Sequence, residues 1–580
     1  MENKNISAFR DARFGMFIHF GLYSILGGRW HGQRMDYIGE WIQSQFRIPN
    51  DEYARLAEQF NPHCFNADEW VKYAKDAGMA YIVFTAKHHD GFAMYHSRVS
   101  RYNIVDATPF GRDVLRELAY ACRRHDIKLG IYYSHCLDWH EQDGADPGPD
   151  SGKNFGMSWG NDWDFPDYQR KDFSRYFEQK TKPQIKELLS EYGPVFLMWF
   201  DCPLQITPEQ GLELRSMVKT LQPDCLINSR IGHNLGDFGS LSDNQHPAGQ
   251  TVLPLESPNT LNHTWGFKKD DHAWLSARKV VSDLADLADK NVNYLLNVGP
   301  RPDGRFPEAS VDILHEAAEW RRTENVVIQN TRPNPFPQSF PWGWCTVNGN
   351  TLQFFVRDWS RTLTINGLRN KITTCAVPFS QHGELVEISL PEGCDSLLPV
   401  IKVEFEGELD IDQRLIPQNG VIELMPSKSL IHRGTMESLI GVPPALGAAA
   451  ELLEEGDRCL IDSSGALTQW HHAGDGASWQ IYVPEGGKYE VAAITENRRH
   501  SAPWVGGRTV EVKFSAQTLK AELKADENIN SDYYCSAVSK FGSFNVLPGE
   551  SGTITFKTLG ITNREAINMN LLAIRFQRIM

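Results

Sequence analysis

The sequence predicts an α/β protein: a (β/α)8-like barrel followed by two antiparallel β-sandwich domains. Through about residue 330, apolar runs alternate with amphipathic segments, as expected for parallel barrels, which span ~200 to more than 400 residues. Beyond that point, short runs of alternating polarity replace the helical pattern, which is typical of antiparallel sheets. We therefore expect a barrel at 1–332 and sandwiches at 333–440 and 441–580.

Seven buried strands are expected in the first domain. Their apolar residues run almost without interruption, as they do in parallel strands that are covered on both faces. An eighth strand is expected near residues 240–245. The seven clearer strands lie at 14–20, 81–89, 128–135, 195–201, 225–230, 251–256 and 292–299.

Helix signals separate these strands. Asn66 has the character of an N-cap, with Glu69 three residues later, and Gly78 is a stop signal. Residues 114–122 and 185–189 carry the apolar stripes of two further helices.

Two breaks divide the rest of the chain. The proline-rich segment 331–337 is unfit for a helix interior, and a Gly/Pro/Ala-rich stretch occupies 441–450. After them we expect short strands at 351–356, 362–365, 385–390, 400–405, 479–483, 489–495, 509–514, 553–556 and 571–576.

Composition excludes several classes of function. The 58 Lys and Arg against 73 Asp and Glu give a net charge of −15, whereas nucleic-acid binders normally carry a basic face. No run reaches the ~18 to 20 apolar residues of a membrane helix. The ten cysteines form no C-x-x-C pair, which argues against a zinc ribbon or a dithiol redox motif. With no secretory signal apparent, we expect a cytoplasmic protein with reduced thiols and neither nucleic acid nor membrane as partner.

Polar side chains stand at the ends of six predicted strands. Barrel enzymes keep their catalytic groups at the C-terminal ends of strands, and buried polar groups need partners. A polar site at the barrel mouth is therefore predicted. The residues at these ends are His19, His88, His89, His135, Asp201, Arg230 and Glu256.

Carboxylates combined with aromatic rings, histidine and arginine are typical of glycoside cleavage. One carboxylate attacks the anomeric carbon, and a second protonates the leaving oxygen. The sequence has no G-x-S-x-G elbow and no Walker A loop. Because neighbouring strand residues point to opposite faces, only one of His88 and His89 is expected to face the mouth. We therefore predict neither a metal nor a cofactor.

Six ordered motifs resemble those of the α-L-fucosidases of glycoside hydrolase family twenty-nine, densely over residues 8–325. They are Arg13 to Gly21 (RFGMFIHFG), Glu40-Trp41, Ala86 to Phe92 (AKHHDGF), Tyr132-Tyr133-Ser134, Trp199-Phe200-Asp201 and Leu296 to Pro300 (LNVGP). The resemblance implies an exo-acting, retaining enzyme that releases terminal L-fucose from fucosylated oligosaccharides or glycoconjugates without a cofactor.

The resemblance also implies roles for individual residues. Asp201 matches the nucleophile, and Glu256 matches the segment that supplies the acid/base in many members. A retaining mechanism would place their carboxyl groups ~5 to 5.5 Å apart. The positions that match fucose-binding residues are His19, Glu40, Trp41, His88, His89, Tyr133, Trp199 and Arg230.

The last domain weakly resembles carbohydrate-binding modules. Its loop at 496–504 contains His500 and Trp504, whose residue types often contact sugars. Two arrangements stay open for this loop. Either it packs on its own sandwich, or it adds His500 and Trp504 to a barrel mouth, that of its own chain or that of a neighbour in a homo-oligomer.

Two other functions compete with the fucosidase. One is a metal-dependent barrel hydrolase that uses His88 or His89 with Asp201 and His135. The other is a non-catalytic carbohydrate-binding protein with an inactive barrel, which an intact Asp201 and Glu256 disfavour.

Overall fold

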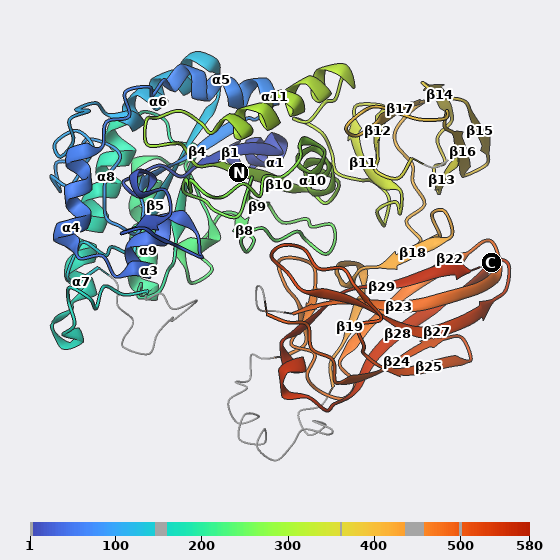
Figure 1. The fold of residues 1–580 in the computed structure, drawn as a ribbon. Coiled ribbons are helices and arrows are strands. Elements are labelled where there is room, and N and C mark those ends of the chain that lie inside the picture. The colour runs from blue at the N-terminus through green and yellow to red at the C-terminus, as the bar shows by residue number, and fades with distance from the viewer. Residues whose placement is uncertain (1–3, 145–158, 360–361, 435–457, 498–501, 580) are drawn as a thin grey trace. The chain divides into compact units, whose positions relative to one another are not determined.

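The computed structural model describes residues 4–144, 159–359, 362–434, 458–497 and 502–579 (Figure 1). The chain divides into two compact units. The first unit comprises residues 1–243, 253–284 and 292–330, and the second comprises 244–252, 285–291 and 331–580. Within the described ranges, no helix combines the length and apolarity needed to cross a membrane.

Eight parallel strands form the sheet of the first unit, in the order β7-β6-β5-β4-β1-β10-β9-β8. A parallel bridge from Asn228 to Phe238 joins the two edge strands, β7 and β8, and the predicted barrel-like fold is confirmed. The strands are β1 (Phe14–Ile18), β4 (Tyr81–Lys87), β5 (Lys128–Ser134), β6 (Leu197–Asp201), β7 (Leu226–Ile227), β8 (Gly239–Ser240), β9 (Leu255–Thr260) and β10 (Val292–Val298).

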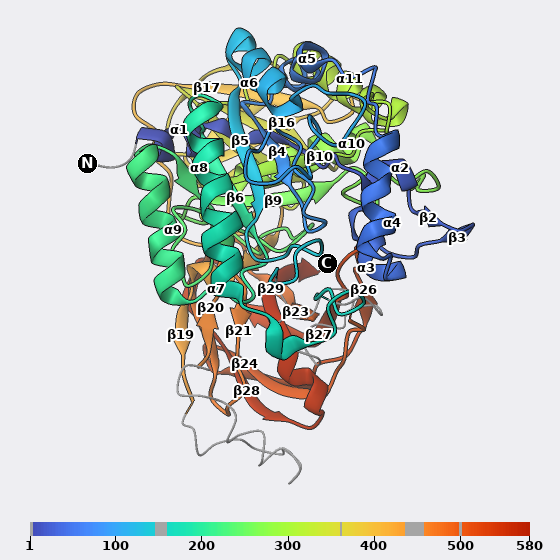
Figure 2. The ribbon, with the colours of Figure 1, turned by 90° about the vertical axis from the view of Figure 1, so that its left-hand side faces the viewer.

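Helices cover the outside of this sheet, and Figure 2 shows α6, α8 and α9 beside β5 and β6. In α5, the Asn66 side chain accepts hydrogen bonds from the N–H groups of Asp68 and Glu69, and Gly78 ends the helix at φ 90°, as predicted. The longer helices are α1 (Lys4–Ala12), α5 (Ala67–Ala77), α6 (Val114–His125), α8 (Lys182–Glu191), α9 (Pro208–Leu221), α10 (Ala277–Asp289) and α11 (Glu308–Thr323).

Short elements near the strand ends complete the first unit. They are α2 (Tyr23–Leu26), β2 (Arg29–Trp30), β3 (Gln33–Arg34), α3 (Ile42–Phe46), α4 (Asn50–Ala54) and α7 (Phe173–Tyr176).

Strand β9 begins later than the sequence predicts. A strand was expected over 251–256, but Val252 and Leu253 are 87% and 54% exposed and belong to a surface loop. The strand itself, Leu255–Thr260, is rich in polar residues and fully buried. Glu256 is therefore its second residue and pairs with Asn293 near the start of β10. The expectation that Glu256 ends a strand is wrong.

The second unit contains two β-sandwiches, as predicted. The first joins the sheets β11-β12-β17-β14 and β13-β16-β15 around a shared apolar core that includes Phe354 and Val386. Its strands are β11 (Gly343–Asn348), β12 (Thr351–Val356), β13 (Thr362–Asn366), β14 (Ile372–Cys375), β15 (Phe379–His382), β16 (Leu385–Ser389) and β17 (Val400–Phe405).

The second sandwich pairs a seven-stranded sheet with a five-stranded sheet. Trp470, Trp479 and Phe556 lie in its core. Strands β18 and β19, both before residue 440, already pair within it. Its strands are β18 (Val421–Leu424), β19 (Leu430–His432), β20 (Leu460–Ile461), β21 (Leu467–Thr468), β22 (Gly476–Val483), β23 (Gly487–Asn497), β24 (Arg508–Phe514), β25 (Gln517–Glu522), β26 (Glu527–Asn528), β27 (Ser536–Val546), β28 (Glu550–Ile561) and β29 (Met569–Ile579).

Two short segments from the barrel part of the sequence belong to the second unit. In segment 244–252, the Ala248 N–H donates to the Ser464 carbonyl at 2.7 Å. In segment 285–291, the Asp289 carboxylate accepts hydrogen bonds from Ser339 at 2.7 Å and from the Cys345 N–H at 2.8 Å. The second unit is thus built from three stretches of chain.

Candidate active site

A cavity of about 130 Å³ opens at the C-terminal ends of the barrel strands. This is the end at which barrel enzymes hold their catalytic groups. Most of the residues predicted from the sequence line it: His19, Glu40, Trp41, His88, His89, Trp199, Asp201 and Arg230. Tyr132, Cys202, Asp243 and Trp265 also line it and were not predicted.

Asp201 is the last residue of β6 and is held by two donors. Arg230 Nη1 donates to Oδ1 at 3.1 Å, and the Tyr132 hydroxyl donates to Oδ2 at 3.0 Å. Burial alone would raise the pKa of Asp201, but the charge of Arg230 and these hydrogen bonds outweigh it and keep the pKa below its usual value. Asp201 is therefore ionised at neutral pH, as a nucleophile must be.

Arg230 connects Asp201 to a second carboxylate, that of Asp243. Its Nη2 donates to Asp243 Oδ1 at 2.6 Å and to the Leu241 carbonyl at 3.0 Å. The guanidinium carbon lies 4.7 Å from the Trp199 ring centroid. The Asp243 side chain is 40% exposed, whereas that of Asp201 is 13% exposed. Arg230 thus joins one shielded carboxylate to one that is open to solvent.

Glu256 lies elsewhere in the barrel. It is fully buried and does not line the cavity. Its Oε2 accepts from the Tyr81 hydroxyl at 2.6 Å, and its Oε1 accepts from Trp199 Nε1 at 2.8 Å. Burial raises the pKa of Glu256 to about 7. Because Tyr81 begins β4 and Glu256 is second in β9, this carboxyl belongs to the N-terminal half of the barrel.

Tyr133, which was predicted to contact the sugar, faces away from the cavity. Its neighbour Tyr132 lines the cavity instead. The Tyr133 hydroxyl donates to Gln184 Oε1 of α8 at 2.8 Å, and Tyr133 is absent from the cavity lining. Side chains alternate along a strand, so a motif with two adjacent tyrosines leaves the inward one undetermined. The expectation that Tyr133 contacts the sugar is not supported by this geometry.

His88 and His89 both line the cavity, so the expectation that only one faces the mouth is wrong. Strand β4 ends at Lys87, and the alternation of strand side chains no longer applies beyond it. His89 Nδ1 is 2.7 Å from Ser134 Oγ, whose hydroxyl donates to the Leu137 carbonyl at 2.9 Å. Ser134 must therefore accept from His89 Nδ1–H, which leaves the Nε2 lone pair facing the cavity, 3.9 Å from Cys202 Sγ.

Burial keeps the histidines of the cavity neutral. It lowers the pKa of His89 to about 4 and that of His19 to about 3. His19 Nδ1 is 2.7 Å from Asn297 Oδ1, which can only accept, so Nδ1 carries the proton. Glu40 Oε2 accepts the Gly266 N–H at 2.7 Å, and burial raises the pKa of Glu40 to about 7. Neutral rings of fixed orientation are suited to the hydroxyls of an uncharged sugar.

Two other predicted residues, His135 and Trp504, lie outside this cavity. His135 packs against Phe200 with ring centroids 5.1 Å apart and does not line it. Trp504 Nε1 donates to Thr495 Oγ1 at 3.0 Å, and its ring packs against the core of its own sandwich. His500 lies outside the described residues. Of the two arrangements considered for its loop, Trp504 therefore adopts the first, in which it packs on its own sandwich.

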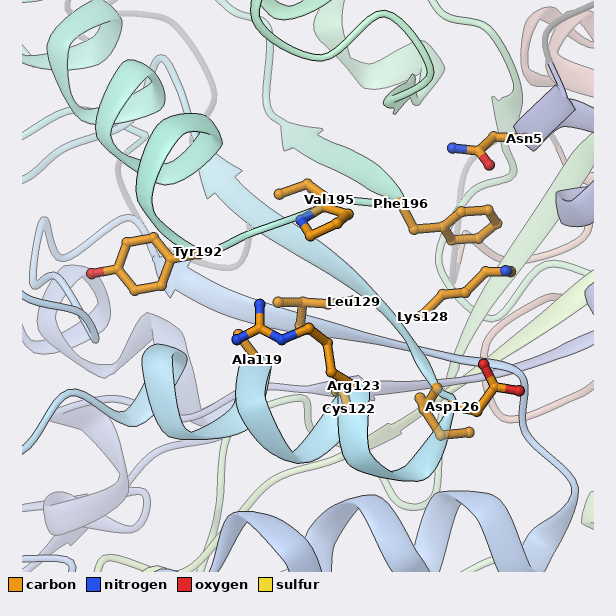
Figure 3. Close-up of a pocket in the computed structure, with 12 residues that line it drawn as sticks. Asn5, Ala119, Cys122, Arg123, Asp126, Lys128, Leu129, Tyr192, Val195 and Phe196 are labelled. Carbon is orange, nitrogen blue, oxygen red and sulfur yellow. The ribbon is translucent and has the colours of Figure 1, made fainter.

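A second cavity, of about 290 Å³, lies at the opposite end of the barrel strands. Figure 3 shows Lys128 and Leu129 at the start of β5 and Val195 and Phe196 just before β6. Among its described lining residues, Asp126 is the sole acid. It offers no pair of carboxylates, so the glycosidase chemistry belongs to the first cavity.

The mouth of this parallel barrel holds two carboxylates that share one arginine, with aromatic rings and neutral histidines around them. This combination of fold and site is that of a glycoside hydrolase. Comparison with known proteins specifies the sugar. The family model for alpha-L-fucosidase matches residues 1–325. The chain belongs to the alpha-L-fucosidase family.

Relatives and solved structures agree with this membership. The mouse tissue alpha-L-fucosidase is 27% identical over 429 residues, which cover 68% of this chain and 89% of the mouse protein. The alpha-L-fucosidase from Vibrio sp. strain EJY3 aligns with a TM-score of 0.82 at 27% identity and covers 100% of this chain and 99% of that chain. AlfC from Lactobacillus casei, solved with its alpha-L-fucose product, is 44% identical with a TM-score of 0.53 and covers 56% of this chain and 100% of its own.

We expect Arg230→Gln to move the acid limb of the pH profile to higher pH. A nucleophilic aspartate must be ionised to attack, and loss of the neighbouring cation raises the pKa of Asp201, so activity lost at pH 5 should partly return at pH 7. Because the guanidinium also positions the Asp201 carboxylate through its 3.1 Å hydrogen bond, kcat/KM at neutral pH should fall about 100-fold or more. The measurement is kcat/KM against pH with 4-nitrophenyl α-L-fucoside. Arg230→Lys, which keeps the charge, is the control, and an unmoved limb in the glutamine variant would contradict the role.

Proposed function

We propose that the protein is a retaining, exo-acting α-L-fucosidase in which Asp201 attacks the anomeric carbon and Asp243 is the general acid/base. The observation that carries the proposal is Arg230, which binds both carboxylates at the cavity. Retaining enzymes need two carboxyl groups ~5 to 5.5 Å apart, and a shared guanidinium keeps two carboxylates close. The small cavity, lined largely by buried side chains, suits one terminal sugar.

The choice of Asp243 as acid/base follows from access. A general acid of a retaining glycosidase first protonates the leaving oxygen and then activates water, so the aglycone and solvent must both reach it. Asp243 is half exposed at the cavity, whereas Glu256 is sealed between Tyr81 and Trp199. Glu40 lines the cavity but is 1% exposed and holds the Gly266 N–H.

The other cavity residues supply recognition of the sugar. His19, His88 and Glu40 offer donors and acceptors to hydroxyl groups, and the Nε2 lone pair of His89 accepts from one. Trp199 and Trp265 offer aromatic faces to the apolar side of the ring. Tyr132 keeps the Asp201 carboxylate oriented through its 3.0 Å hydrogen bond.

The stereochemistry of the released sugar tests this mechanism. An AlfC variant has been solved with 4-nitrophenyl-a-L-fucopyranoside and another complex with Fuca(1,6)GlcNAc, and we propose both compounds as substrates here. Proton NMR during hydrolysis should show α-L-fucose first, with the β anomer appearing later by mutarotation. Initial release of β-L-fucose would show inversion and would require wider-spaced carboxylates.

We expect full activity after exhaustive treatment with EDTA. Fucose is uncharged, and the histidines, Glu40 and Arg230 can meet its hydroxyls without an ion. The check is kcat/KM before and after chelation, together with elemental analysis of the protein. Loss of stoichiometric zinc together with activity would instead support the metal-dependent hydrolase.

We also propose that the last sandwich mediates a homo-oligomer. The long connection between β23 and β24, residues 498–507, supports the proposal, although Trp504 itself packs on its own sandwich. Sedimentation velocity of the full chain tests it, and a monomer at micromolar concentration would reject it.

A further inference from the structure

Three atoms of kinds that bind metals, one of them from the proposed nucleophile Asp201, lie close together at the cavity. His89 Nε2 lies 3.8 Å from Asp201 Oδ2 and 3.9 Å from Cys202 Sγ. These nitrogen, oxygen and sulfur atoms all lie within 4.8 Å of one another, and the three residues line the cavity. Imidazole, carboxylate and thiolate together are the ligand types that Zn²⁺ takes in proteins.

The two separations measured from His89 are close to those between the ligands of a bound metal. Zinc binds nitrogen and oxygen at ~2.0 to 2.2 Å and sulfur at ~2.3 Å, so the ligand atoms of a tetrahedral site lie roughly 3.3 to 3.6 Å apart. The two observed separations to His89 exceed this range by only a few tenths of an ångström. The open side of the cavity leaves the fourth position to water.

His89 is already arranged as a ligand. Its Nδ1–H is donated to Ser134, whose own hydroxyl proton goes to the Leu137 carbonyl. The buried Lys87 ammonium donates to the same carbonyl at 3.2 Å, which fixes the acceptor at the end of this chain of hydrogen bonds. A histidine that donates one ring N–H to a fixed acceptor and presents the other nitrogen is the usual arrangement around metals.

Cys202 is aimed at the same point by the backbone. It follows the last residue of β6 and has φ 51°, a left-handed conformation that is uncommon outside glycine. Burial raises the pKa of the Cys202 thiol well above its usual value, so the free enzyme holds a thiol. Binding a divalent ion would release one proton from this thiol to solvent as the metal–sulfur bond forms.

We propose that His89, Asp201 and Cys202 form an inhibitory binding site for thiophilic divalent ions such as Zn²⁺ and Cd²⁺. An Asp201 oxygen that ligates a metal cannot attack the anomeric carbon, and the ion occupies the space of the sugar. The inhibition, though not the binding, rests on the proposed role of Asp201 as nucleophile. Metal and L-fucose should therefore compete for the cavity.

Cadmium reports binding separately from activity. We expect titration of the whole enzyme with CdCl₂ to produce the ultraviolet charge-transfer band of a cadmium thiolate. The band should be lost in Cys202→Ser and kept in Cys394→Ser, which removes an exposed thiol outside the cavity. Saturating L-fucose should suppress it. Cys202→Gly, which adopts a positive φ without strain, is a second variant should the serine variant fold poorly.

Zinc inhibition of 4-nitrophenyl α-L-fucoside hydrolysis provides the second measurement, each variant being compared with its own metal-free rate. Ser134→Ala should weaken inhibition about 10- to 100-fold, as loss of a partner behind a ligand does, and Cys202→Ser should weaken it at least about 100-fold. Equal bands and equal inhibition in Cys202→Ser and Cys394→Ser would overturn the proposal. A band that depends on Cys202 without any loss of rate would overturn the inhibition and count against Asp201 as the nucleophile.

Discussion

Replacing Asp201 by glycine should lower kcat by about 10⁴-fold or more, because no other carboxylate at the cavity can form the covalent intermediate. Sodium azide should restore part of the rate, since the small anion can enter the vacated space and attack the anomeric carbon from the same face. The measurement is release of 4-nitrophenol with and without azide, together with NMR identification of β-L-fucosyl azide.

Asp201→Asn is the matched control for this experiment. It removes the charge but keeps the side-chain volume, so it should be equally inactive and should gain nothing from azide. Far-ultraviolet circular dichroism of both variants excludes unfolding. Near-normal turnover by either variant would remove Asp201 from the role of nucleophile.

Comparing Asp243→Ala with Glu256→Gln should show which of the two carboxyl groups is the general acid. Loss of the acid should slow cleavage of Fuca(1,6)GlcNAc by about 10² to 10⁴-fold and that of 4-nitrophenyl fucoside far less, because nitrophenolate leaves without protonation. We expect this pattern for Asp243→Ala. Glu256→Gln should change both substrates in proportion, because it disturbs the hydrogen bonds from Tyr81 and Trp199 rather than proton transfer.

The ratio of kcat/KM for the two substrates is the quantity that decides. Azide gives an independent reading. Of these two variants, only the one that lacks the general acid/base should release its fucosyl-enzyme intermediate faster when azide is present. If the leaving-group pattern appears in Glu256→Gln and not in Asp243→Ala, the acid role returns to Glu256, and the barrel interior must then open during catalysis.

The barrel could be predicted because its strands are apolar. Strands such as β6 and β10 are buried on both faces, and burial at that depth selects continuous apolar runs. Strand β9 lacks that signal, since its buried residues are mainly polar and its apolar neighbours Val252 and Leu253 face solvent. The search for apolar runs therefore placed this strand too early in the chain. It put Glu256 at the C-terminal end of the strand, whereas Glu256 lies near the N-terminal end.

The site was predictable where a residue ends a clear strand. Asp201 and His19 follow long apolar runs, and both line the cavity. Asp243 follows β8, which has only two residues, so no periodic pattern marks its strand. Tyr132 and Tyr133 share one motif, and only the direction of each side chain, which depends on strand register, tells them apart.

The segments 244–252 and 285–291 bear on how such an enzyme evolves. AlfC is covered in full by 56% of this chain, so a fucosidase exists at roughly the length of one unit. Here the second unit draws on three stretches of chain, one of which starts immediately after Asp243. Recombination at a single point near residue 330 would therefore transfer an incomplete module. Chimaeric fucosidases built from this chain should therefore be joined at all five boundaries between the units, near residues 243, 252, 284, 291 and 330.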